Sequence, residues 1–178
     1  MKNVNWNDVQ DDIRRPVPGG YAVKITRVED NEEKEYLKIE WEFADGEFKG
    51  ANKETYDAFG FWPLSFVASY KDSALRFFRG FKTAVEESNR NFVFKNDPQS
   101  LVGKYLGVVL GEEEYFSTKH NMVKTRLYVA EKRSGAAIRN GDFKIPALKK
   151  LDNSKMASVG ASAANFAEMD GDDEDLPF

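Results

Sequence analysis

The sequence contains no cysteine and a single histidine, His120. The absence of thiols excludes a disulfide framework and a cysteine nucleophile, and one imidazole does not supply the usual zinc ligand sets or a convincing catalytic triad. No glycine-rich stretch has the spacing of a phosphate-binding loop. We therefore expect neither an enzyme nor a bound cofactor or metal, although a metal site built from carboxylates alone stays open.

Long hydrophobic runs are also missing. No stretch reaches the roughly 18 consecutive apolar residues of a membrane span, and residues 1–15 are too polar and charged for a secretory signal. Together with the absence of cysteine, this indicates a cytoplasmic protein. With 178 residues, of which 41% are apolar, the chain can bury one substantial core but is short for two full domains.

Charge is distributed unevenly along the chain. The net charge is −4, but residues 168–178 hold six acidic residues and no basic one, which leaves a net +2 for residues 1–167. Residues 104–155 hold eleven Lys and Arg against six Asp and Glu. A basic body with an acidic end suits a protein that binds a polyanion and whose tail competes for the same surface.

Several segments alternate apolar and polar side chains, as half-buried β-strands do. Residues 21–28 and 36–43 show this alternation most clearly, and the acidic turn between them makes the pair a predicted hairpin. We expect a third strand over residues 53–59. Two more strands are expected over residues 104–110, where Gly107 fits a tight bend, and over residues 123–129, with a loop from Gly111 to Met122 between them.

A helix is predicted between these two groups of strands. Asp72 is a suitable N-cap, and Asp97 followed by Pro98 predicts one further short helical turn. Residues 73–88 have helical spacing, with an apolar stripe made of Ala74, Phe77, Phe78, Phe81, Ala84 and Val85.

Three strands, a helix and two strands are the element order of the OB-fold, a five-stranded barrel that often binds oligonucleotides. Other small β-rich folds can share this order, but an SH3-like barrel lacks so long a helix and a split sandwich would have more strands. We therefore predict a mainly β protein with an OB-fold domain over residues 20–133. A lead-in segment (1–19) precedes it, and a basic extension (134–151) and a flexible linker with an acidic tail (152–178) follow.

Binding a single strand without reading its sequence requires cations for the phosphates and exposed aromatic rings on which bases stack. The polar faces of the predicted strands offer both, as does the loop before the last strand, which OB-folds often close over the bound strand. Tyrosines packed at strand edges and solvated bases are the alternative, and Phe59 and Trp62 belong either to a stacking platform or to a cap of the barrel. The candidate DNA-binding residues are Lys24, Tyr36, Lys38, Lys53, Tyr56, Phe59, Trp62, Tyr105, Tyr115, Phe116, Lys119, Lys124, Arg126 and Tyr128.

The acidic tail ends on Leu-Pro-Phe. Its carboxylates repel one another, which predicts a mobile segment, and the terminal aromatic ring suits an apolar pocket on a partner protein. A tail that serves only solubility is the alternative. The segment resembles the acidic tip of bacterial single-stranded DNA-binding proteins, whose last residues recruit replication and repair enzymes. The predicted partner-binding residues are Asp172, Asp173, Glu174, Asp175, Leu176, Pro177 and Phe178.

The body carries a second resemblance. Residues 19–21, 36–46, 101–104 and 112–115 resemble a family of small phage-encoded single-stranded DNA-binding proteins. The resemblance implies a protein of the host cell cytoplasm that coats single-stranded DNA during replication, recombination or repair and recruits partners through its tip. A non-enzymatic adaptor or inhibitor that binds protein is the alternative, and both a monomer and a dimer stay open.

Overall fold

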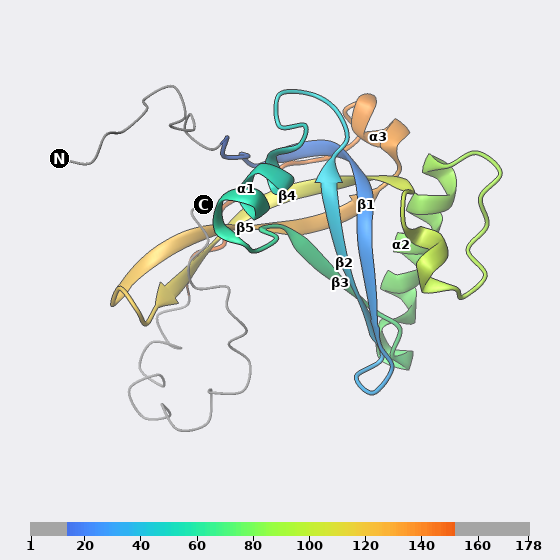
Figure 1. The fold of residues 1–178 in the computed structure, drawn as a ribbon, viewed down its shortest axis with the longest axis horizontal. Helices are drawn as coiled ribbons and strands as arrows, with labels where there is room; N and C mark the ends of the chain where they lie inside the picture. Colours follow the sequence, from blue (N-terminus) through green and yellow to red (C-terminus); the bar gives the residue numbers. More distant parts are fainter. Residues whose placement is uncertain (1–13, 152–178) are drawn as a thin grey trace.

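Five antiparallel strands form one sheet in the structure, a computed structural model that describes residues 14–151 (Figure 1). The strands are β1 (Gly19–Asn31), β2 (Tyr36–Phe43), β3 (Ser65–Ser69), β4 (Tyr105–Ser117) and β5 (Met122–Arg133), in the order β3-β2-β1-β4-β5. All four pairings are antiparallel, so the two edge strands, β3 and β5, run in the same direction. No ladder joins β3 to β5, and the sheet is therefore not closed.

The first hairpin has the predicted alternation. Every second residue of β2 from Leu37 to Phe43 is buried. In β1, Val23 and Ile25 are buried, but a register irregularity between Ile25 and Arg27 then moves the buried position to Val28. Such a bulge adds one residue to a strand and reverses which side chains face the core.

The predicted third strand over residues 53–59 is wrong, because these residues lie in helix α1 (Ala51–Phe59). Gly50 and Gly60 bound the helix with φ of 83° and 80°, values that glycine adopts without strain. Inside it, the Thr55 hydroxyl donates to the carbonyl of Ala51, four residues earlier, at 3.0 Å. The third strand is instead the shorter β3, where Phe66 and Ala68 are buried.

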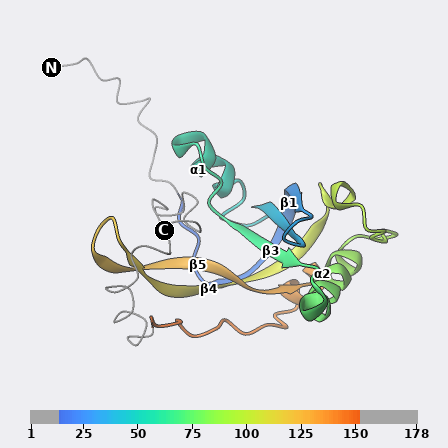
Figure 2. The same cartoon turned by 90° about the horizontal axis from the view of Figure 1, so that it is seen from below.

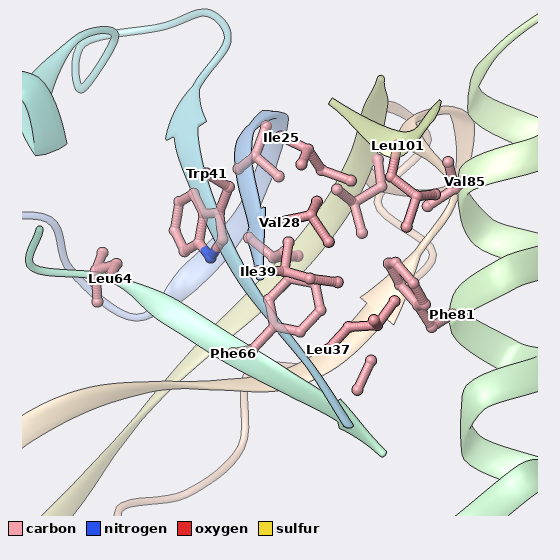
Figure 3. Packing of buried hydrophobic residues seen from close by; sticks show 14 of the residues in the cluster. Ile25, Val28, Leu37, Ile39, Trp41, Leu64, Phe66, Phe81, Val85 and Leu101 are labelled. Atoms are coloured by element: carbon pink, nitrogen blue, oxygen red, sulfur yellow. The ribbon is translucent and has the colours of Figure 1, made fainter. Parts of the chain in front are cut away.

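Helix α2 (Leu75–Ser88) confirms the predicted helix and follows a 3-10 turn, η2 (Asp72–Ala74). It lies across one end of the sheet (Figures 1 and 2). Phe81 and Val85 face the sheet core, close to Leu37 and Leu101 in Figure 3. Phe77, expected in the apolar stripe, is 72% exposed. The predicted short turn is confirmed as η3 (Pro98–Leu101), where the Asp97 side chain accepts a hydrogen bond from the Gln99 N–H.

The predicted loop from Gly111 to Met122 is mostly strand. β4 and β5 pair as far as Ser117 and Met122, so only residues 118–121 form the turn, and the two strands make a long arm. Gly107 lies in the paired part of β4, opposite Ala22 and Arg133. A Cβ on Gly107 would lie 2.9 Å from the Ser134 carbonyl oxygen, and the glycine lets helix α3 (Gly135–Arg139) approach the sheet.

Residues 140–151 run back along one side of this arm (Figure 2). The Phe143 ring lies against Gly20, and Lys149 exchanges backbone hydrogen bonds with Glu112 and Glu114 at 3.0 and 2.8 Å. We call the surface of β1, β4 and β5 beneath α3 and this segment the outer face. Within residues 14–151, no helix is long and apolar enough to cross a membrane.

Candidate nucleic-acid interface

A groove of about 340 Å³ separates the facing edges of β3 and β5. We call it the edge groove. Since the two strands run in the same direction, Pro63 and Arg126 mark its beginning, and Val67 and Lys132 lie toward its end near α2. Its lining residues are Pro63, Leu64, Ser65, Phe66, Val67, Glu113, Arg126, Leu127, Tyr128, Val129 and Lys132.

Lys132 is the first of two cations that line the edge groove. It pairs with the buried Val108 on β4 and so points to the core side of the sheet, where its ammonium lies 5.0 Å from the centre of the Phe66 ring. Burial lowers the pKa of Lys132 below the ordinary lysine value. Within residues 14–151, Lys132 forms no ion pair with a carboxylate, so its charge is available to an anionic ligand.

Arg126 also lines the edge groove, at its other end, although its side chain points to the outer face, as those of Tyr128 and Glu113 do. Its guanidinium lies 5.2 Å from the centre of the Tyr115 ring and donates to Glu113 at 3.0 Å. Lys149 lies 4.0 Å from the other oxygen of the same carboxylate. Glu113 therefore shares one negative charge between two cations, which leaves this cluster net positive.

Exposed aromatic rings gather where the chain enters β3. Tyr56 of α1 is 49% exposed and lies 6.0 Å from the Trp62 ring, and Phe59 stacks on Phe61 at the same centroid distance. Trp62 is half-buried, and its Nε1–H donates to the Trp41 carbonyl oxygen at 3.0 Å. Since Trp62 directly precedes Pro63, this aromatic cluster lies at the beginning of the edge groove. The structure thus brings Tyr56, Phe59 and Trp62 together, although on a helix and a loop rather than on a strand.

A different group of candidates lies on the outer face. The Lys24 ammonium is 5.9 Å from the centre of the exposed Tyr105 ring, on neighbouring strands. Tyr128, which also lines the edge groove, has the Lys149 ammonium of the segment after α3 3.7 Å from its ring centre. On the outer face, each of these two tyrosine rings is therefore already in contact with a lysine of the same chain.

The remaining candidates are dispersed. Tyr36 accepts a hydrogen bond from Asn31 at 3.3 Å near the tip of the first hairpin, and Lys38 lies on the polar side of β2 between Glu29 and Val67. Lys53 forms an ion pair with Asp57 on α1 at 2.9 Å. Three candidates lie along the arm and in its turn: Phe116, Lys119 and Lys124.

The sequence alone did not identify Lys132, the cation of the edge groove that forms no ion pair within residues 14–151. A register irregularity opposite Val109 and Leu110 separates Val129 from Glu131, so the alternation counted from Leu127 and Val129 fails at Lys132. Lys132 lies directly across from the buried Val108, and this pairing indicates that its side chain is on the core side of the sheet. The position of the bulge was not readable from the sequence.

The predicted partner-binding residues 172–178 lie outside the described residues. Within the described range, no three His, Asp or Glu side chains are grouped as a metal site requires. No known family model matches the sequence, and no curated protein matches it.

Proposed function

We propose that this protein binds single-stranded DNA independently of sequence and is built on an OB-type barrel that is open between β3 and β5. The strand order supports the fold assignment. In an OB barrel the five strands form a partly open Greek-key barrel, and here β1 pairs with both β2 and β4 while β3 and β5 are the two free edges. The helix between β3 and β4 lies across one end of the sheet, where it covers the core.

One observation carries the functional proposal: the edge groove joins an exposed aromatic cluster to two cations. Trp62, whose ring lies 6.0 Å from that of the exposed Tyr56, directly precedes Pro63 at the beginning of the groove, while Arg126 and Lys132 line the groove along β5. Base stacking on aromatic rings contributes about 1–3 kcal/mol per base, and it does not depend on which base is bound. Cations along the same groove displace counterions from the phosphates. Aromatic rings and cations in one groove suit a protein that coats single-stranded DNA without reading its sequence.

The proposal includes a role for the acidic tail. Residues 172–178 recruit replication or recombination proteins, because an aromatic residue after a run of acids suits an apolar pocket rimmed by basic side chains. Before DNA binds, the same acids compete for the basic groove. Deleting residues 168–178 is therefore expected to raise DNA affinity at low salt.

The test uses fluorescence anisotropy of a labelled oligo-dT of about 30 nucleotides, long enough to span the roughly 4–16 nucleotides of one OB-fold. A duplex competitor and a salt titration accompany it. We expect binding that survives the duplex and weakens steeply with salt. Absence of a preference for the single strand would refute the DNA-coating function and favour the protein-binding adaptor.

Two tyrosines of equal exposure locate the binding surface. Tyr56, in the aromatic cluster, is 49% exposed, and Tyr105, on the outer face, is 47% exposed. Tyr56→Ala is expected to weaken oligo-dT binding by at least about fivefold, corresponding to about 1 kcal/mol of lost stacking. Tyr105→Ala, the matched control, should leave the affinity nearly unchanged. The opposite order of effects would move the site to the outer face.

A further inference from the structure

A second groove, of about 710 Å³, lies between α2 and the last residues of β5. We call it the helix groove. Helix α2 contributes Arg76, Phe77, Arg79 and Gly80 to its walls, and β5 contributes Lys132 and Arg133. None of the α2 residues was among the candidates expected to bind DNA.

The charges of the helix groove are unbalanced. Within residues 14–151, Arg76 and Arg79 form no ion pair, whereas Lys82 on the same helix is bound to Glu86 at 2.7 Å. Arg133 is paired with Glu131 at 2.7 Å. Four cations (Arg76, Arg79, Lys132 and Arg133) and two carboxylates (Glu87 and Glu131) line the groove, so its net charge is +2, a composition that favours a polyanion.

Phe77 adds an aromatic ring beside these cations. It is 72% exposed, whereas Phe78 and Phe81 of α2 pack toward the core, and the Arg76 guanidinium lies 5.5 Å from its ring centre. Gly80, one turn further along α2, leaves open space where a side chain would stand. Glycine inside a helix costs about 0.5–1 kcal/mol relative to alanine, so an open site beside Phe77 is maintained at a cost in stability.

The two grooves share one lining residue, Lys132, and adjoin there. The edge groove runs along β3 and β5 toward α2, and the helix groove begins where β5 reaches that helix. Both are lined by Lys132, which forms no ion pair within residues 14–151, and aromatic rings lie near both: Phe77 in the helix groove, and the aromatic cluster directly before Pro63 at the beginning of the edge groove. A single-stranded nucleic acid meets both requirements with its phosphates and bases, whereas an acidic peptide would use only the cations.

We propose that the bound strand leaves the edge groove past Lys132 and continues into the helix groove, where Arg76 and Arg79 bind phosphates and Phe77 stacks on a base. This inference rests on the proposed single-strand binding. It gives that activity a second segment on α2, so that the DNA path extends beyond the sheet. Oligonucleotides that fill only the edge groove do not contact α2.

The test compares the full-length protein with the double variant Arg76→Ala/Arg79→Ala on oligo-dT of about 6 and about 30 nucleotides, of which the first is near the lower end of the usual range of one OB-fold and the second is above that range. Each phosphate contact on a single strand contributes about 0.7 to the slope of log affinity against log salt. On the long oligonucleotide the variant should therefore lose about 1.4 of that slope, and at about 0.1 M salt about 25-fold in affinity. On the short one it should match the wild type.

The matched control is Arg90→Ala/Lys95→Ala, which removes two exposed cations that line neither groove. A second variant, Phe77→Ala, should lower long-oligonucleotide affinity by at least about fivefold. Circular dichroism and thermal melts establish that every variant is folded. An equal loss in the control and the α2 double variant would show a general charge effect and overturn the proposal.

The remaining outcomes separate this proposal from the function on which it rests. If the wild type binds oligo-dT but neither α2 variant changes long-oligonucleotide affinity, the α2 path is wrong and single-strand binding stands. An equal loss on both lengths would place the arginines in the primary site and would also overturn the extension. If the wild type does not prefer the single strand, the proposed function itself fails.

Discussion

Replacing Lys132 with Met is expected to weaken single-strand binding while leaving the fold intact. Lys132 lines both grooves, and methionine keeps most of the aliphatic contact with the Phe66 ring. Loss of one phosphate contact removes about 0.7 from the salt slope, which at about 0.1 M salt corresponds to about fivefold in affinity, or about 1 kcal/mol. Anisotropy titrations over a range of salt concentrations measure both quantities.

Stability is expected to respond differently from affinity. The variant loses a cation–π contact of about 0.5–1 kcal/mol but also removes a partly buried ammonium whose charged form is disfavoured by desolvation. These effects oppose each other, so the free energy of unfolding should change by less than about 1 kcal/mol in urea titrations. A large loss of stability that parallels the loss of affinity would refute the reasoning, because Lys132 would then act through the fold.

The pH dependence of the free energy of unfolding and of DNA affinity provides an independent test of the role of Lys132. Because burial lowers its pKa below the ordinary value of 10.5, the unfolded chain binds more protons than the folded chain between the lowered pKa and 10.5. The free energy of unfolding of the wild type should therefore rise with pH in that window relative to Lys132→Met. In the same window, DNA affinity of the wild type should fall toward that of the variant. If the unfolding free energy and the DNA affinity had the same pH dependence in the wild type and in Lys132→Met, the lowered pKa and the DNA-binding role of Lys132 would both be contradicted.

Three further predictions test the fold and the corrected candidates. Gly107→Ala should destabilise the protein by about 1–3 kcal/mol in urea melts, because the added methyl would lie 2.9 Å from the Ser134 carbonyl oxygen, whereas Gly80→Ala should stabilise it. Lys53→Ala should leave oligo-dT affinity within about twofold in anisotropy, since an exposed i,i+4 ion pair on α1 already neutralises that charge. Burial raises the pKa of Glu42 despite its backbone hydrogen bonds, so the unfolding free energy should fall as pH rises from 4.5 through the folded pKa, and Glu42→Gln should abolish that fall.

The elements that the sequence predicts well are those with one clear period. β2 alternates strictly from Leu37 to Phe43, and the helical stripe of α2 contains the buried Phe81 and Val85. Helix α1 was mistaken for a strand because nine residues with only three buried positions fit either period. Gly50 and Gly60 bound the helix with positive φ, and these backbone angles cannot be read from the sequence.

The candidate site was only partly predictable for a related reason. Tyr56 and Trp62 were identified by residue type, and their proximity follows from α1 and the loop after it, which the strand prediction did not contain. Lys132 was missed because a β-bulge reverses the side-chain alternation just before it. Phe77 was assigned to the core because helical spacing cannot distinguish the rim of an apolar stripe from its centre.

The distribution of glycine on the outer face explains why the edge groove, rather than that face, is the better candidate. At Gly20, Gly107 and Gly111 a Cβ would collide with parts of α3 or the segment after it, including the Phe143 ring and, at 2.6 Å, the Pro146 ring. These positions have no side chain because the chain's own C-terminal part packs directly on the sheet there. A nucleic acid on the outer face would have to displace this packing. No residue of α3 or of the segment after it lines the edge groove, so a strand that enters this groove does not displace that packing and competes only with the ion pair between Arg126 and Glu113.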